Sequence, residues 1–388
     1  MPIGAAALAL ALLGGCATSD GGGGSRGRAV YLSVPLEGSA GAYGRAIRDG
    51  AELALRHESR SGDGSRPRLE SRDDTRGGRW SPVVVADNAR AATSHSAAVA
   101  YLGEFESGAT SSSLPITNEA RMLQVSPAST ALDLVSPFPG SDEVPELVQP
   151  TGERTFGRVI PDDEVQAEAG ATWARRLGAR SAYIVSDGSR FGDAMADEFG
   201  EEAAALGIAV ERAGRRVDAA RVGKSDPDLL YFGGAAGAAL PFLGRVARSS
   251  DATIMGTDAL LLDRGFLRRA RPFESRLRLT AAAQDPAQLP PPRGPRFVRR
   301  FRAAYGHEPD PYAAYGYEAM AVVLDSIDRA ADPVDRSTIL DAFFDTSNRD
   351  SILGTYSIDE LGDTTLNRLA GYRVRDGRPA FDAGLETP

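Results

Sequence analysis

The sequence contains very little cysteine and histidine. Cys16 is the only cysteine among 388 residues, and the three histidines, His57, His95 and His307, lie far apart along the chain. A disulfide needs two cysteines, and a zinc site needs several Cys or His ligands at short spacing, so we expect neither here. The fold must then depend on the burial of apolar side chains. At this length two lobes are expected rather than a single core.

The sequence also lacks the short motifs of common enzymes. It has neither the Gly-x-Ser-x-Gly turn of a serine hydrolase nor the Gly-x-x-x-x-Gly-Lys loop that binds nucleotide phosphates. Gly38, Gly41 and Gly44 follow an apolar run, but their spacing does not match a dinucleotide-binding loop. We therefore predict a protein that is not an enzyme and that has no cofactor or metal.

An excess of positive charge is missing as well. The formal net charge is −9, and the 44 basic residues are scattered among 53 acidic ones without forming a basic stripe. All the basic residues except Lys224 are arginines. Nucleic-acid binding usually needs clustered basic residues, so we do not expect a nucleic-acid partner.

A short apolar run opens the chain. It covers residues 5–13, which is too short to span a bilayer but has the length of a signal-peptide core. The run ends at Leu13-Gly14-Gly15-Cys16, which resembles a bacterial lipobox, whose cysteine thiol receives a diacylglyceryl group. The sequence thus predicts a signal peptide at residues 1–15, a lipid-anchored Cys16 with a flexible tether at residues 16–27, and a location outside the cytoplasmic membrane. The alternative is a buried structural cysteine.

From residue 28 onward, short apolar runs alternate with longer stretches of helical periodicity. This pattern predicts an α/β fold with parallel sheets, in which ligands bind beyond the carboxyl ends of the strands. The Pro- and Gly-rich stretches at residues 136–154 and 286–295 predict loops. We expect strands at residues 29–35, 68–73, 98–103, 122–126, 181–186, 209–213, 229–232, 253–256 and 277–281, and helices at residues 43–58, 164–177, 193–206, 297–305 and 313–330.

Several segments, taken in order, point to one family. They include Pro35-Leu36-Glu37-Gly38, Ser126-Pro127-Ala128-Ser129-Thr130, Met255-Gly256-Thr257-Asp258 and Tyr315-Gly316-Tyr317-Glu318-Ala319. With these segments the chain resembles the periplasmic binding proteins of branched-chain amino-acid ABC transporters, the leucine/isoleucine/valine-binding group. The resemblance implies a type I periplasmic binding protein, with two doubly wound, Rossmann-like lobes joined by a three-stranded hinge. We expect one lobe at residues 28–156 plus 282–352 and the other at residues 157–281 plus 353–388.

The resemblance also implies a ligand site between the lobes. Ser107, Ala128 and Thr130 take the positions that hold an amino acid's carboxylate, and Asp258 takes the position of the acid that meets its ammonium group. The aromatic side chains that lie against the ligand correspond to Tyr43 and Phe191. Each position has an ordinary structural alternative: Ser107, Thr130 and Asp258 are also residue types that cap helices, and Tyr43 also suits a core.

Some residues depart from the family pattern. Asp258 is one methylene shorter than the usual glutamate, and Ala235 and Ala236 stand where a tyrosine is often found. Glu104 and Glu106 flank the site near Ser107, and a carboxylate directed inward there would repel an anion. The segment between residues 214 and 229 is also short for a crossover helix. A cationic, polar or amide ligand is therefore an alternative to an amino acid.

Three functions stay open on the sequence alone. The leading prediction is a monomeric, lipid-anchored solute-binding protein that closes on an amino acid or similar small polar molecule and docks on an ABC permease. In the second, a receptor or kinase reads the same closure as a signal. In the third, the fold serves as a regulatory lipoprotein that binds another protein, such as a cell-wall synthase.

Overall fold

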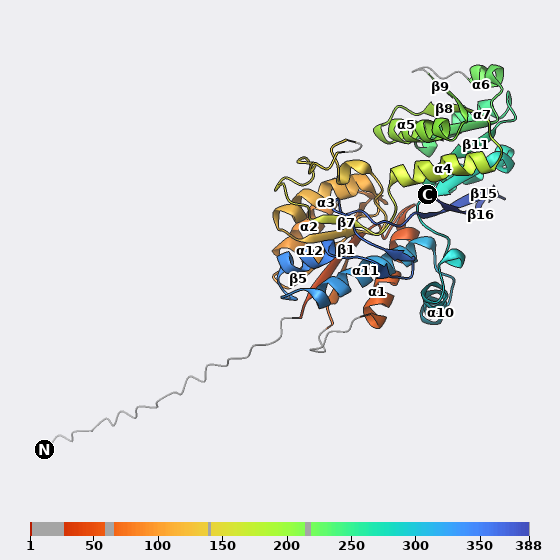
Figure 1. Cartoon of the computed structure of the whole chain (residues 1–388). Helices are drawn as coiled ribbons and strands as arrows, with labels where there is room; N and C mark the ends of the chain where they lie inside the picture. The colour runs from red at the N-terminus through yellow and green to blue at the C-terminus, as the bar shows by residue number, and fades with distance from the viewer. Residues whose placement is uncertain (2–26, 59–65, 139–140, 214–218, 388) are drawn as a thin grey trace.

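The computed structural model describes residue 1 and residues 27–58, 66–138, 141–213 and 219–387. The predicted signal peptide, Cys16 and most of the tether lie outside these residues. Within them the chain forms two α/β lobes, which Figure 1 shows with the crossing segments between them. None of the helices in this part of the chain has the length and apolar character needed to cross a membrane.

The first lobe contains a five-stranded parallel sheet in the order β2-β1-β5-β6-β7. Helices α1 and α11 pack together on one face, and α2 and α3 pack together on the other. The strands are β1 (Ala29–Val34), β2 (Arg68–Asp73), β5 (Ala98–Leu102), β6 (Leu123–Ser126) and β7 (Phe156–Arg158), and the helices are α1 (Gly41–His57), α2 (Pro82–Ser94), α3 (Ser107–Glu119), α10 (Arg293–Tyr305), α11 (Pro311–Arg329) and α12 (Arg336–Phe344).

Strand β1 shows why the sequence folds in this way. All six of its residues are buried, and successive side chains point to opposite faces of the sheet. Val30 and Leu32 join the core beneath α1 and α11, whereas Ala29 and Tyr31 join a second core beneath α2. A strand covered on both faces needs a continuous apolar run, and the sequence supplies one.

The second lobe contains a seven-stranded sheet in the order β16-β15-β12-β11-β10-β8-β9. The five strands from β12 to β9 are parallel, while β15 and β16 pair antiparallel at one edge. The strands are β8 (Ser181–Ser186), β9 (Ala209–Arg212), β10 (Leu229–Gly233), β11 (Thr253–Gly256), β12 (Leu277–Ala281), β15 (Arg368–Arg375) and β16 (Arg378–Glu386), and the helices are α4 (Asp163–Arg176), α5 (Arg190–Ala205), α6 (Ala219–Ser225), α7 (Ala236–Val246), α8 (Asp258–Leu261) and α9 (Arg264–Arg269).

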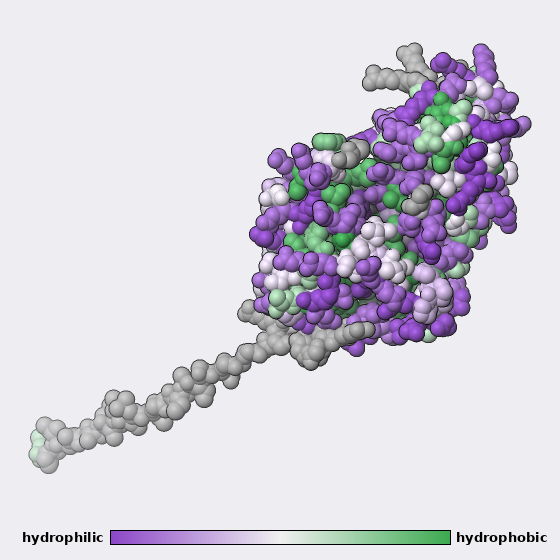
Figure 2. All heavy atoms as spheres, in the orientation of Figure 1, coloured by the Kyte–Doolittle hydropathy of each residue, from purple (hydrophilic) through white to green (hydrophobic). Residues whose placement is uncertain are grey.

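Two short hairpins and three 3-10 turns complete the described structure. The hairpins are β3 (Thr75–Arg76) with β4 (Arg79–Trp80), and β13 (Arg349–Asp350) with β14 (Thr355–Tyr356), and the turns are Leu132–Leu134, Arg271–Arg276 and Pro286–Gln288. Both hairpins belong to the first-lobe side of the chain. The face seen in Figure 2 is mainly hydrophilic, with hydrophobic side chains visible as separate patches.

All nine predicted strands are present, with ends within one residue of the observed ones, and the parallel α/β fold is confirmed. The sequence did not predict β7, β15 or β16. Strand β7 places Gly157 and Arg158 in the first sheet, so that sheet extends two residues beyond the expected lobe boundary. Helix α6, of seven residues, supplies the short crossover before β10.

Candidate functional site

Helix α3 begins at the end of β5 and brings Ser107 to the loop that follows β6. The Ser107 hydroxyl accepts hydrogen bonds from the backbone N–H groups of Thr130 and Ala131, each at 3.2 Å. The N-cap of α3 is Glu106, so Ser107 is not the cap that the alternative interpretation proposed. Ala128 is also on this loop, and its N–H donates to the Ser126 hydroxyl. The three predicted carboxylate-binding residues therefore lie together.

Tyr43, on α1, belongs to an aromatic cluster at the carboxyl end of the first sheet. Its ring stacks on Phe105 with centroids 5.7 Å apart, and Tyr312 meets both rings edge-on. The Tyr43 hydroxyl donates to the carbonyl of Leu262 at 3.4 Å, which connects the two lobes. Burial raises the pKa of Tyr43, so its hydroxyl stays protonated.

Asp258 is the first residue of α8, and the residue that caps this helix is Thr257, whose hydroxyl accepts from the Ala259 N–H. Burial raises the pKa of Asp258 to about 6, and hydrogen bonds from Gln166 and the backbone partly oppose that shift. Asp258 is thus a partly desolvated carboxyl group at the end of β11, where the resemblance placed it.

The structure adds one residue that the sequence reasoning missed, Asp163. It is the first residue of α4, directly after the chain crosses to the second lobe, and its side chain is 6% exposed. Burial raises its pKa to about 7, the negative charge of Asp258 adds to the shift, and a hydrogen bond from Thr130 and the charge of Arg158 oppose it. One carboxylate oxygen, Oδ1, has no hydrogen-bond partner among the described residues.

Asp163 and Asp258 are therefore two second-lobe carboxyl groups close enough to interact, and Asp163 contacts Thr130 of the first lobe. Tyr231 is fully buried beside both, and their negative charges add to the effect of burial in raising its pKa. The side-chain oxygen of Gln166 is also buried, and no described residue donates to it. Buried acceptors without donors are costly, so this arrangement suits a ligand that supplies N–H groups and positive charge. In the sequence, Asp163 could have been noticed because it forms an adjacent acidic pair with Asp162 shortly after the short strand β7.

Glu104, which was expected to flank the site, is fully buried in the first lobe. The backbone carbonyl of Glu104 accepts a hydrogen bond from Ser129, on the loop of residues 127–131 that follows β6 and that we call the binding loop. The Tyr101 hydroxyl donates to Glu104 Oε1 at 2.6 Å. Burial raises the pKa of Glu104 to about 8 and that of neighbouring Asp74 to about 7, and the two carboxyl groups are within hydrogen-bonding reach of each other. Both oxygens of Asp74 and one of Glu104 lack a donor among the described residues. A shared proton resolves this, because it makes one carboxyl a donor.

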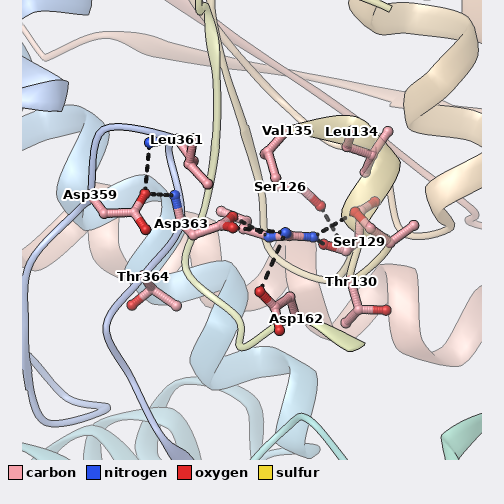
Figure 3. A network of polar contacts seen from close by, with 12 residues as sticks. Ser126, Ser129, Thr130, Leu134, Val135, Asp162, Asp359, Leu361, Asp363 and Thr364 are labelled. Carbon is pink, nitrogen blue, oxygen red and sulfur yellow. Dashed lines mark hydrogen bonds and ion pairs between the residues drawn. The ribbon is translucent and has the colours of Figure 1, made fainter. Parts of the chain in front are cut away.

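A buried arginine holds the binding loop against the hinge (Figure 3). The Arg158 guanidinium pairs with Asp363 at 2.5 and 3.0 Å and donates to the carbonyls of Ala131 and Ser129 at 2.9 and 3.4 Å. Asp162, at the start of the second lobe, lies 3.8 Å away. Arg158 thus joins β7, the loop that carries Thr130, and the segment in which the chain crosses between lobes for the third time.

Two cavities border this region. One, of about 310 Å³, is lined by Ser107, Asp163 and Phe191, and thus by residues of both lobes. The other, of about 230 Å³, lies beyond Tyr43 and Tyr312. Of the predicted site residues, Ser107 and Phe191 line the larger cavity and Tyr43 lines the smaller one, whereas Ala128, Thr130 and Asp258 line neither. No cluster of three metal-binding side chains occurs among residues 27–58, 66–138, 141–213 and 219–387.

Comparisons with known proteins identify similar chains. The Leu/Ile/Val-binding protein BraC3 of Rhizobium johnstonii is 25% identical over 369 residues, covering 90% of this chain and 92% of that protein. The structure of the leucine-binding protein LivK of Thermotoga maritima has a TM-score of 0.73 at 25% identity, covering 92% of this chain and 99% of that one. A substrate-binding protein of Desulfitobacterium hafniense, in complex with Leu, has a TM-score of 0.73 at 20% identity and the same coverage.

The family description that matches is that of a periplasmic binding protein, and the match covers residues 32–378. It spans both lobes and every described site residue discussed above. This chain belongs to the periplasmic binding protein family.

Proposed function

We propose that this protein is the extracytoplasmic solute-binding component of an ABC transporter and that it binds a small ligand with an amino group between its lobes. The observation that carries the proposal is Asp163, which accepts a hydrogen bond from Thr130 of the other lobe. Its buried Oδ1 has no donor among the described residues, and the negative charge of Asp258 acts on it. A ligand ammonium group makes charge-assisted hydrogen bonds to such acids, and these are among the stronger polar contacts. Relatives named as Leu/Ile/Val-binding proteins support the same class of ligand.

Closure of the lobes couples binding to transport. Thr130 and Tyr43 belong to the first lobe, whereas Asp163, Asp258 and Leu262 belong to the second. A ligand that contacts both groups binds the closed form more tightly and shifts the population toward it. In this proposal the closed form docks on the permease. A receptor that reads closure, or a protein partner in place of a small ligand, would leave the same fold, and neither has a specific observation in its favour.

The direct test is a thermal-shift screen of the purified protein against amino acids, amines, amides, nucleosides and sugars. A ligand at about one hundred times its Kd adds about 2.7 kcal/mol of stability, which produces a visible shift in Tm. Stabilisation by amino compounds alone is the expected result. Stabilisation by sugars or nucleosides alone would contradict the proposal.

Removing the acid at the second-lobe site should weaken binding. We expect Asp258→Ala to raise the Kd of the best amino ligand more than tenfold, which corresponds to about 1.4 kcal/mol, because the ligand ammonium loses an ionic partner. Isothermal titration calorimetry measures the change. Asp251→Ala is a matched control, since Asp251 is a fully exposed aspartate at the other end of β11. Equal affinities for both variants would remove Asp258 from the site.

A further inference from the structure

The cavity of about 310 Å³ is the larger of the two that border the site, and its wall comes from both lobes. We call it the α3–α5 chamber, because it lies where these two helices begin. The first lobe contributes Ser107 and Leu132, and the second contributes Asp163, Phe191 and Met195. Apolar atoms make up most of the wall, and the buried carboxyl of Asp163 is part of it.

On the side of the site away from the chamber, three aromatic side chains of the protein itself pack together. Tyr43, Phe105 and Tyr312 contact one another with centroids 5.0 to 5.7 Å apart. Phe105 and Tyr312 are also buried, at 7% and 4% exposure. The 230 Å³ cavity beyond this cluster does not include Asp163 or Ser107 in its wall. A ligand held by Asp163 therefore has open space in the α3–α5 chamber.

The groups that would hold a ligand carboxylate are already engaged within the protein. The backbone N–H groups of Thr130 and Ala131 both donate to the Ser107 hydroxyl. The N–H of Ala128 donates to Ser126. A carboxylate at this position would have to displace these internal hydrogen bonds.

The charges along the chamber also disfavour an anion. Asp133, Asp163 and Glu198 are acidic, and Arg190 is the single cation among the described residues of the wall. Arg190 already pairs with Asp133 at 2.9 Å, across the two lobes. Asp163 Oδ1 has no donor in the described chain, so the unmet need in the chamber is for a hydrogen-bond donor, which an ammonium group supplies together with positive charge.

From these observations we infer that the preferred ligand is an apolar amine without a carboxylate. Its ammonium group donates to Asp163, on which the negative charge of Asp258 also acts, and its hydrocarbon or aryl body lies between Leu132, Phe191 and Met195. This inference rests on the proposed solute-binding function and specifies the ligand class of the same site. The apolar wall rewards a hydrocarbon body, and the chamber places it next to the carboxyl group that binds the amine.

Matched pairs of compounds test the inference on the full-length purified protein. Isopentylamine, 2-phenylethylamine and tyramine are leucine, phenylalanine and tyrosine without the carboxylate. In isothermal titration calorimetry we expect at least one of these amines to bind at least tenfold more tightly than its parent amino acid. If each amino acid binds as tightly as its amine, or if none of the three amines binds, the inference is overturned. Leucine binding in that case would still support the proposed function.

A variant that fills the chamber provides a second test. Ala194 lines the α3–α5 chamber, whereas Ala204 is exposed on the same helix. Ala194→Phe should weaken binding of the preferred amine at least tenfold, and Ala204→Phe should leave it unchanged. Both variants should keep the wild-type circular dichroism spectrum. Unchanged amine affinity in a folded Ala194→Phe protein would place the ligand body elsewhere and would overturn the inference.

Discussion

Arg158 is a fully buried cation, and its removal would leave the carboxylates of Asp363 and Asp162 without a positively charged partner. Its guanidinium pairs with Asp363 and lies 3.8 Å from Asp162, and it also holds two carbonyls of the binding loop. Breaking a buried ion pair from one side costs more than the pair contributes when intact, because a desolvated charge is left without its partner. The same side chain therefore supports both the hinge and the ligand site.

We expect Arg158→Met to lower the free energy of unfolding by about 3–5 kcal/mol, the range for a buried pair broken from one side. Urea denaturation measures this difference. Arg90→Met is the control, because Arg90 pairs with Asp87 on an exposed helix surface, where such pairs contribute about 0–1 kcal/mol. Similar losses in the two variants would show that the Arg158 network is not a stabilising element.

The Asp74–Glu104 pair makes stability depend on pH. Burial raises both pKa values, to about 7 and about 8, whereas the unfolded chain has ordinary values near 4. Between these limits the folded protein binds more protons than the unfolded chain. The stability from this pair is therefore present at low pH and is lost as pH rises toward 8. Glu106 and Asp73 add negative charge, and Tyr101 and Ser33 hydrogen-bond to Glu104.

We expect Tm to fall between pH 5.5 and pH 8 and the slope to be smaller in Glu104→Gln, which keeps the shape of the side chain but removes its titration. Differential scanning calorimetry across this range gives the slope. Glu146→Gln, at an exposed site, should leave it unchanged. Asp163 and Asp258 add slope of the same sign, so part of the dependence should persist. If Tm falls with pH as steeply in Glu104→Gln as in the wild-type protein, the titration of Glu104 does not contribute to the pH dependence of stability.

At the scale of elements, α1 and α11 approach each other through glycine. A Cβ atom at Gly316 would lie 2.2 Å from the carbonyl oxygen of Ile47, and one at Gly50 would lie 2.0 Å from that of Ala313. The two backbones are thus closer than any side chain permits. This contact joins segments far apart in sequence and covers one face of the first sheet.

We expect Gly316→Ala to destabilise the protein by about 1–3 kcal/mol, the usual cost of overpacking a core. Gly244→Ala, in the interior of α7, should instead stabilise it by about 0.5–1 kcal/mol, because a Cβ there meets nothing within 4 Å. Chemical denaturation of both variants shows whether each substitution lowers or raises the free energy of unfolding. A neutral Gly316→Ala would mean that the helices can move apart without loss.

The sequence predicted the elements that carry strong apolar patterns. Strands with continuous buried runs, such as β1 and β10, were found because both of their faces are covered. Strand β7 has only three residues, which is too short for a pattern. The β15–β16 hairpin has polar residues on its exposed side, but Asp376-Gly377, both with positive φ, is a hairpin turn signal that could have located it. The adjacent acids Asp162 and Asp163 are visible in the sequence, but Asp163 was missed because β7, the short strand before it, was not predicted.

At the scale of the whole molecule, the predicted lipid anchor at Cys16 can be tested directly. We expect Cys16→Ser to shift the protein from the membrane fraction to the soluble fraction, because the substitution removes the thiol that would carry the diacylglyceryl group and stable attachment needs more than one acyl chain. Cell fractionation with immunoblotting measures the change. Continued sedimentation with membranes would contradict a lipid anchor at this residue.

The first lobe is built from two chain segments that are separated in sequence by most of the second lobe, and this order matters while the chain is being synthesised. Helix α1 packs on α11, and roughly 270 residues separate Ile47 from Gly316, which corresponds to roughly 15–50 seconds of translation. The parallel strands of the second lobe are complete before α11 emerges, so that part of its sheet can form first, before β15 and β16 are added. The apolar face of α1 stays uncovered during this interval, when newly made chains are most open to aggregation. The amino-terminal lobe therefore cannot complete its packing until the parallel strands of the second lobe have been made.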